Sequence, residues 1–162
     1  MNKLSLTTPR QTVIAVLAGA LLTGMGLAVY DLVSAFPPVV PWSVPVTLGV
    51  LGIAGIIYAL LLPKRREEQK VDAQEGFVAV VSGKAMIFTG AVIAGAHCVY
   101  VMKYLPSMEA ATPAQRVIQG SATIVASLLV ALAGSMIEHR LVLKDPPGGA
   151  SDGRHAPEAE AQ

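Results

Sequence analysis

The chain alternates between long apolar stretches and short segments rich in charged residues. Four stretches carry no charged residue: 13–30, 44–62, 85–102 and 117–137. Each has about 18 to 21 residues, and a helix of ~20 residues crosses the ~30 Å hydrocarbon core of a bilayer. Backbone groups in lipid must form their hydrogen bonds within the segment, so these stretches are expected to be α-helices. The pattern therefore predicts an all-α integral membrane protein.

The helices are expected to extend slightly beyond the uncharged stretches. Apolar residues from Phe77 to Val81 precede Lys84, so the third helix is expected to begin near Phe77. The predicted helices are 11–34, 44–63, 77–105 and 115–141. They form a membrane domain of residues 11–144, between an N-terminal tail (1–10) and a disordered tail (145–162) that is rich in Pro, Gly, Ala and Glu.

The distribution of Lys and Arg predicts how the chain is threaded. Ten of the 12 basic residues lie before the first uncharged stretch, between the second and the third, or after the fourth, and the other two connections hold only Lys103 and Arg116. Because basic residues are retained on the cytoplasmic side, both termini are expected to be cytoplasmic. Trp42, Tyr100 and Tyr104 then lie near the outer interface, where aromatic rings anchor helices.

The composition excludes several classes of protein. Hydrophobic residues make up 53% of the chain and charged residues 14%, against roughly 25% charged in a soluble domain. The net charge of +1 excludes a broad nucleic-acid surface, and one cysteine excludes an intramolecular disulfide.

The first apolar stretch is longer than the ~7–15 residues of a cleavable signal peptide, so we expect it to be retained, although residues 33–35 resemble a cleavage site.

Small residues recur at helical spacing in all four stretches, which favours close helix packing in a bilayer. The main examples are Ala15, Gly19, Thr23, Gly49, Gly52, Gly55, Ala59, Gly90, Ala91, Ala94, Gly95, Ser127, Ala131 and Ser135. We expect two helical hairpins in a compact four-helix bundle, with a second copy of the chain or another membrane protein as a partner.

Four ionisable residues lie at or near membrane depth, where charge is costly. Lys84 either extends its ammonium to the headgroups or makes an internal polar or lipid-head contact. Glu138 ends the fourth apolar stretch at a similar depth and needs a cation, so a Lys84–Glu138 ion pair is the most specific structural hypothesis. Arg140 is placed to complement the C-terminus of the fourth helix.

His97 lies in the outer half of the third helix. A proton relay would need acidic partners, and none of the four uncharged stretches contains Asp or Glu. We therefore expect a neutral histidine that is hydrogen-bonded across the bundle.

Three short motifs resemble a known family. They are the proline-dense segment 36–45 (FPPVVPWSVP), Gly83-Lys84-Ala85 and the Ile137-Glu138-His139-Arg140 ending. In this order and spacing they resemble an actinobacterial membrane family, domain of unknown function 3180, over approximately residues 10–147. The resemblance implies a plasma-membrane protein of unassigned activity.

The leading functional hypothesis is a non-enzymatic accessory or scaffold protein that acts through helix packing. The alternative is a small dimeric multi-span transporter or permease, although such proteins use a carboxylate in the first span and residues 13–30 contain none. The sequence shows no convergent acid, base, metal or cofactor ligands, so no enzyme activity and no cofactor are expected. The expected partners are the lipid bilayer and membrane proteins, not nucleic acid.

Overall fold

The computed structural model describes residues 6–35, 37–67 and 73–142. Within these ranges it contains no strand, four long helices and one short 3₁₀ helix: α1 (Pro9–Leu32), α2 (Ser43–Glu67), α3 (Ala73–Tyr104), η1 (Leu105–Ser107) and α4 (Ala111–Val142). Each α-helix is long and apolar enough to cross a membrane. The predicted tail 145–162 and residues 1–5 of the N-terminal tail lie outside the described residues.

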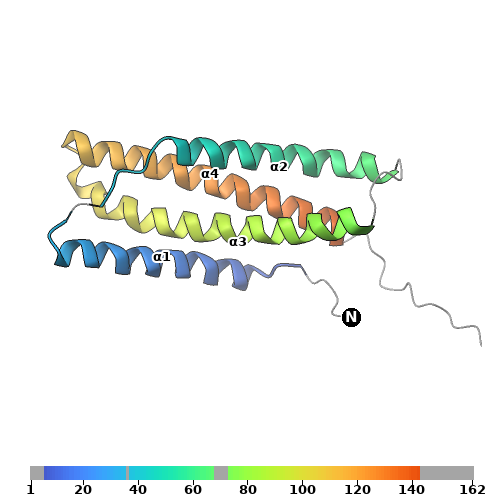
Figure 1. The fold of residues 1–162 in the computed structure, drawn as a ribbon, viewed down its shortest axis with the longest axis horizontal. Coiled ribbons are helices and arrows are strands. Elements are labelled where there is room, and N and C mark those ends of the chain that lie inside the picture. Colours follow the sequence, from blue (N-terminus) through green and yellow to red (C-terminus); the bar gives the residue numbers. More distant parts are fainter. Residues whose placement is uncertain (1–5, 36, 68–72, 143–162) are drawn as a thin grey trace, which may run out of the picture.

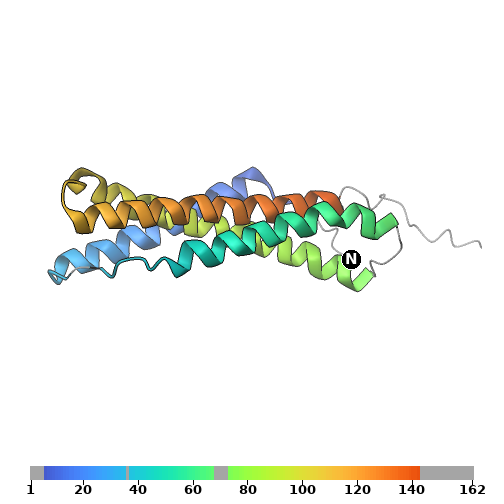
Figure 2. The ribbon, with the colours of Figure 1, turned by 90° about the horizontal axis from the view of Figure 1, so that it is seen from above.

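The four helices lie side by side in the order α1, α3, α4, α2 (Figure 1). Successive helices run in opposite directions, so the start of α1 and the end of α4 lie at the same end of the molecule. The view from above shows α1 crossing α3 at an angle (Figure 2). α3 and α4 are therefore the central helices, and α1 and α2 are the outer ones.

The two expected hairpins are not both formed. α3 and α4 pack closely against each other, but in the described residues the α1 backbone contacts only α3 and the α2 backbone contacts only α4. The connection between α1 and α2 is proline-dense, and residues 37–41 have no regular secondary structure, because proline has a fixed φ and no N–H donor. It runs from the end of α1 across α3 and α4 to reach α2 on the far side (Figure 1).

The outer helices expose large apolar side chains. Only 17% of the most apolar window of α1 is buried, against 44% for α4. Leu21, Leu22 and Met25 of α1 are each 67–69% exposed. Soluble monomers rarely expose such continuous apolar surface, whereas lipid tails solvate it, so this exposure is consistent with a membrane protein.

The helices extend further than their apolar stretches. α3 begins at Ala73 and α4 at Ala111, each four residues before the predicted start, and α2 continues through Pro63 to Glu67. Charged residues mark where the apolar stretch ends, but backbone hydrogen bonding continues into the polar turns beyond it. α1 begins with a capping box, in which the backbone N–H of Gln11 donates to Thr8 Oγ1 and the backbone N–H of Thr8 donates to Gln11 Oε1.

Two glycines allow α1 to approach α3 closely. A Cβ added at Gly19 would collide with the Val92 carbonyl oxygen, and one added at Gly95 would collide with the Val16 carbonyl oxygen. The contact is reciprocal, because each helix contributes a glycine against the other's backbone. Small residues therefore determine where α1 binds, since lipid-solvated helices gain little from apolar burial alone.

Candidate functional site

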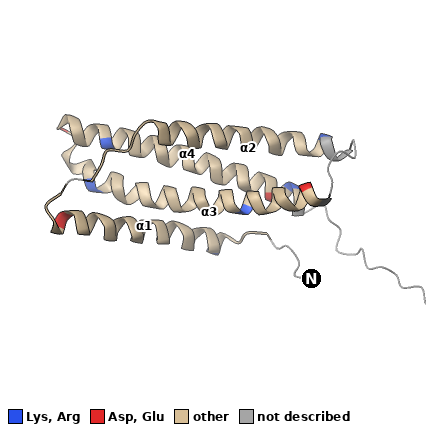
Figure 3. Ribbon diagram, in the orientation of Figure 1, with Lys and Arg blue, Asp and Glu red and all other residues tan. Residues whose placement is uncertain are grey.

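The ion pair expected between α3 and α4 is present. Lys84 Nζ lies 3.6 Å from Glu138 Oε1, and the Glu138 side chain is only 2% exposed, against 28% for Lys84. Charged residues gather towards the two ends of the helices and leave the middle uncharged (Figure 3). The pair lies at the end shared by the start of α1 and the end of α4, so it joins the two central helices there.

Glu138 has a second partner, which sequence reasoning missed. The backbone N–H of Thr7, just before α1, donates to Glu138 Oε1 at 2.7 Å. One carboxylate therefore connects α3, α4 and the segment that leads into α1. A backbone donor carries no sequence signal, so this contact was not predictable.

The other predicted polar residues have simpler environments. Arg140 is half-buried in the last turn of α4, where a cation complements the helix C-terminus. His97 does not bond across the bundle as expected, because its Nδ1 lies 2.9 Å from the carbonyl oxygen of Ile93, one turn earlier in α3. The carbonyl one turn earlier is within reach of the ring, so this nitrogen is paired inside α3.

A second polar cluster lies at the opposite end of the molecule, around Arg116. This residue is 6% exposed, and its Nη1 donates to Tyr100 Oη at 3.0 Å. Its guanidinium lies 4.9 Å from the centroid of the Tyr104 ring, a cation–π contact. Tyr100 was expected as an interface anchor, but it is 7% exposed and donates to the Pro38 carbonyl at 3.3 Å. It holds the connection between α1 and α2 against α3.

Trp42 and Gln119 extend this cluster. With its amide oriented to satisfy its neighbours, Gln119 donates to the Val40 carbonyl at 2.7 Å and accepts from Trp42 Nε1 at 3.0 Å. The Trp42 side chain is 53% exposed, so its ring remains available to the interface while its N–H is bonded. Arg116 and Gln119 were not predicted, although their spacing of three residues places them on one face of α4.

An exposed ion pair joins α1 to α3 at the end of the molecule where Arg116 lies. Lys103 Nζ lies 2.6 Å from Asp31 Oδ1 and 2.7 Å from Oδ2. Because both side chains reach solvent, the pair contributes little to stability.

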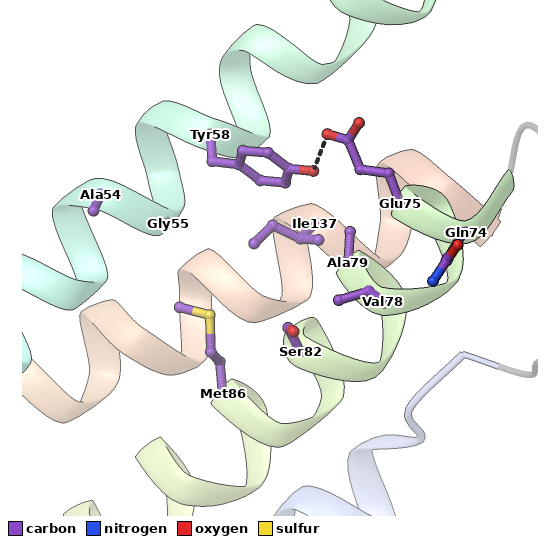
Figure 4. Close-up of a pocket in the computed structure, with 10 residues that line it drawn as sticks. All are labelled: Ala54, Gly55, Tyr58, Gln74, Glu75, Val78, Ala79, Ser82, Met86 and Ile137. Carbon is purple, nitrogen blue, oxygen red and sulfur yellow. Dashed lines mark hydrogen bonds between the residues drawn. The ribbon is translucent and has the colours of Figure 1, made fainter. Parts of the chain in front are cut away.

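A cleft of about 670 Å³ opens between α2 and α3, which do not pack backbone to backbone. Ala54, Gly55 and Tyr58 line it from α2, and Ile137 of α4 forms part of its wall. From α3 it is lined by Gln74, Glu75, Val78, Ala79, Ser82 and Met86. Figure 4 shows Tyr58 and Glu75 reaching towards each other across it, and Tyr58 Oη donates to Glu75 Oε1 at 3.3 Å.

The described residues place no three His, Cys, Asp or Glu side chains within reach of a shared metal ion. The polar groups instead form two clusters that join helices, together with the polar end of the α2–α3 cleft.

Comparison with known proteins identifies the family and no individual relative. No curated protein and no solved structure is significantly similar to this chain. The family model described as "Protein of unknown function (DUF3180)" matches residues 12–144, a range that includes all four apolar stretches and both polar clusters except Thr7. The chain belongs to this family of proteins of unknown function, DUF3180.

Proposed function

We propose that this protein is a non-enzymatic accessory or scaffold of the plasma membrane, with both termini in the cytoplasm, which acts by packing its outer helices against another membrane protein. The arrangement of the helices in an open row carries the proposal. Among the described residues the backbone of α1 packs only against α3 and the backbone of α2 only against α4, and α2 reaches α3 through side chains alone. The remaining faces of both are free to bind a partner's helices.

The positions of the polar groups support a structural role. The buried carboxylate of Glu138 is engaged by Lys84 and by the Thr7 N–H, and Arg116 is engaged by two tyrosines. Charged residues that serve to join helices leave the exposed apolar faces as the surfaces for interaction.

Photocrosslinking in native membranes tests the proposal. A photoreactive amino acid replaces Leu21, which is 67% exposed on α1, and in a matched control replaces Leu62, which is 1% exposed on α2. Affinity purification with the C-terminal tail intact is expected to yield one stoichiometric protein adduct from the Leu21 variant and none from the Leu62 variant.

Two results would contradict the proposal. The first is identical adducts from both positions, because a buried side chain cannot report a partner surface. The second is a homodimer without other proteins that moves solute in proteoliposomes, which would establish the alternative, a small dimeric transporter or permease.

A further inference from the structure

We propose that Arg116 is the centre of a binding site for a phosphate group, supplied either by the headgroup of a phospholipid or by free phosphate. Tyr100 and Tyr104 hold the guanidinium in place, and the phosphate accepts hydrogen bonds from the N–H groups that the tyrosines leave unused. The site lies within this chain and depends neither on a protein partner nor on which side of the membrane it faces.

The charge of Arg116 is not neutralised within the described part of the chain. A buried charge is costly unless an opposite charge and hydrogen bonds compensate for its lost hydration, and Arg116 is only 6% exposed. Both tyrosines are neutral at physiological pH, so they contribute contacts but no negative charge. Of the carboxylates at this end, Asp31 binds Lys103 through both oxygens. Glu109 is exposed and forms no ion pair among the residues described.

The guanidinium also has donors left for a ligand. Arginine has five N–H donors, and the one hydrogen bond of Arg116 to a described residue is made by Nη1, to Tyr100 Oη at 3.0 Å. Tyr104 contacts the guanidinium through its ring and not through an oxygen acceptor. Within the described ranges, Thr7 Oγ1 is the only enclosed side-chain oxygen or nitrogen without a partner, so Nε and Nη2 of Arg116 reach the surface. These two nitrogens form an edge that binds two phosphate oxygens as a bidentate pair.

The guanidinium is held in place before a ligand binds. Tyr100 Oη accepts from Arg116 and itself donates to the Pro38 carbonyl at 3.3 Å, so the hydroxyl is fixed from both sides. The Tyr104 ring centroid lies 4.9 Å from the guanidinium carbon. A side chain that is already ordered loses little conformational entropy on binding, which favours affinity for a small anion.

The depth of Arg116 favours a phospholipid as the source of the phosphate. The uncharged stretch 117–137 begins directly after Arg116, so Arg116 lies where the apolar part of α4 ends. The headgroup layer of a bilayer begins at this depth, and every phospholipid carries its phosphate there. Trp42, which is 53% exposed and belongs to the same cluster, is typical of that layer. Because so little of Arg116 is exposed, the opening admits a small anionic group and not the surface of a partner protein.

The test uses the purified full-length protein in a maltoside detergent, which carries neither phosphate nor charge, and measures bound lipid by native mass spectrometry. Phosphatidylglycerol, diacylglycerol with the same acyl chains, or inorganic phosphate is added at equal concentration. We expect the protein to retain one phosphatidylglycerol, and diacylglycerol at least about tenfold less, the value of one charge-assisted hydrogen bond. Retention of inorganic phosphate in place of phosphatidylglycerol would support the site and assign it to free phosphate.

Variants at arginine positions show where the lipid binds. Arg116→Gln removes the charge and is expected to lower the retained phosphatidylglycerol about tenfold or more. Arg116→Lys keeps the charge but not the paired donors, so it is expected to lower retention less. The matched control is Arg10→Gln, which removes an exposed guanidinium at the other end of the molecule and is expected to leave retention unchanged. Gel filtration and circular dichroism show whether each variant is folded.

If Arg116→Gln does not fold, nuclear magnetic resonance of the unmodified protein with ¹⁵N-labelled arginine replaces it. The Nε–H signal of Arg116 is identified by its proximity to the rings of Tyr100 and Tyr104. It is expected to shift on addition of phosphatidylglycerol, with saturation near one equivalent, and not on addition of diacylglycerol.

Equal retention of phosphatidylglycerol and diacylglycerol, retention of neither phosphate-bearing probe, or the same loss in Arg10→Gln as in Arg116→Gln would overturn the proposal. An Arg116 signal that does not move with either phosphate-bearing probe would do the same. No partner protein is present in these samples. A failure here is therefore separate from a failure to find a scaffold partner in native membranes.

Discussion

A carboxylate enclosed between membrane helices is stable only when a cation or several donors compensate for its lost hydration. Glu138 meets this condition twice, through the ammonium of Lys84 and through the backbone N–H of Thr7. The sequence predicted the first partner because both residues interrupt apolar stretches at similar depth. It did not predict the second, since any residue at position 7 except proline would supply the same donor.

Loss of the ammonium is expected to destabilise the protein. Lys84→Met keeps the apolar stem and removes the charge, so the free energy of unfolding should fall by about 1–3 kcal/mol, less than for a wholly enclosed pair because Lys84 is 28% exposed. Glu138→Gln retains an acceptor for the Thr7 N–H, so it should lower the free energy of unfolding less than Glu138→Ala does. Thermal unfolding in detergent, followed by size exclusion, measures these differences.

Reversal of the pair separates the charge attraction from the backbone contact. The double variant Lys84→Glu with Glu138→Lys is expected to be more stable than either single reversal. It should remain less stable than the unmodified protein, because a lysine at position 138 cannot accept the Thr7 N–H. A double variant that accumulates no better than the single ones would show that the pair contributes nothing.

At the scale of the helices, the attachment of α1 depends on its contact with α3. The small residues at Gly19 and Gly95 were visible in the sequence, but the partner of each helix was not. Small-residue spacing is common to all four apolar stretches and is equally compatible with several pairings. The proline-dense connection decides between them, because its length and stiffness carry α2 past α3 to the far side of α4.

Replacing a glycine by alanine is expected to destabilise the protein inside the α1–α3 contact and not outside it. Gly19→Ala and Gly95→Ala place a Cβ on a carbonyl oxygen of the other helix. Each is expected to lower the free energy of unfolding by about 1–3 kcal/mol through overpacking. Gly24→Ala and Gly26→Ala, on α1, meet nothing within 4 Å and are expected to be neutral or stabilising by up to ~1 kcal/mol. The same thermal unfolding assay measures all four, and equal shifts would contradict the glycine contact.

At the scale of the whole molecule, four antiparallel helices place the start of α1 and the end of α4 at one end. The side of the membrane on which this end lies is a prediction from the sequence. The basic residues supply that information, because they are retained on the cytoplasmic side during insertion. The orientation is therefore inferred from the sequence.

Cysteine accessibility tests the orientation. In a Cys98→Ser background, Glu109→Cys is expected to react with a membrane-impermeant maleimide in intact cells. Lys64→Cys is expected to react only after lysis, because it lies at the end of α2 next to the basic segment. Both residues are exposed, so burial does not prevent labelling. Labelling of Lys64→Cys in intact cells would reverse the assigned orientation.

The sequence by itself determined the number of helices and their approximate limits, because the length of an apolar stretch and the cost of charge in lipid are local properties. It also determined the family and the Lys84–Glu138 pair. Only the tertiary structure decided the order α1, α3, α4, α2, the enclosure of Arg116 by two tyrosines and the opening between α2 and α3. These features depend on which helix faces which, and apolar helices in lipid differ little in their attraction for one another until backbone contacts and polar partners select an arrangement.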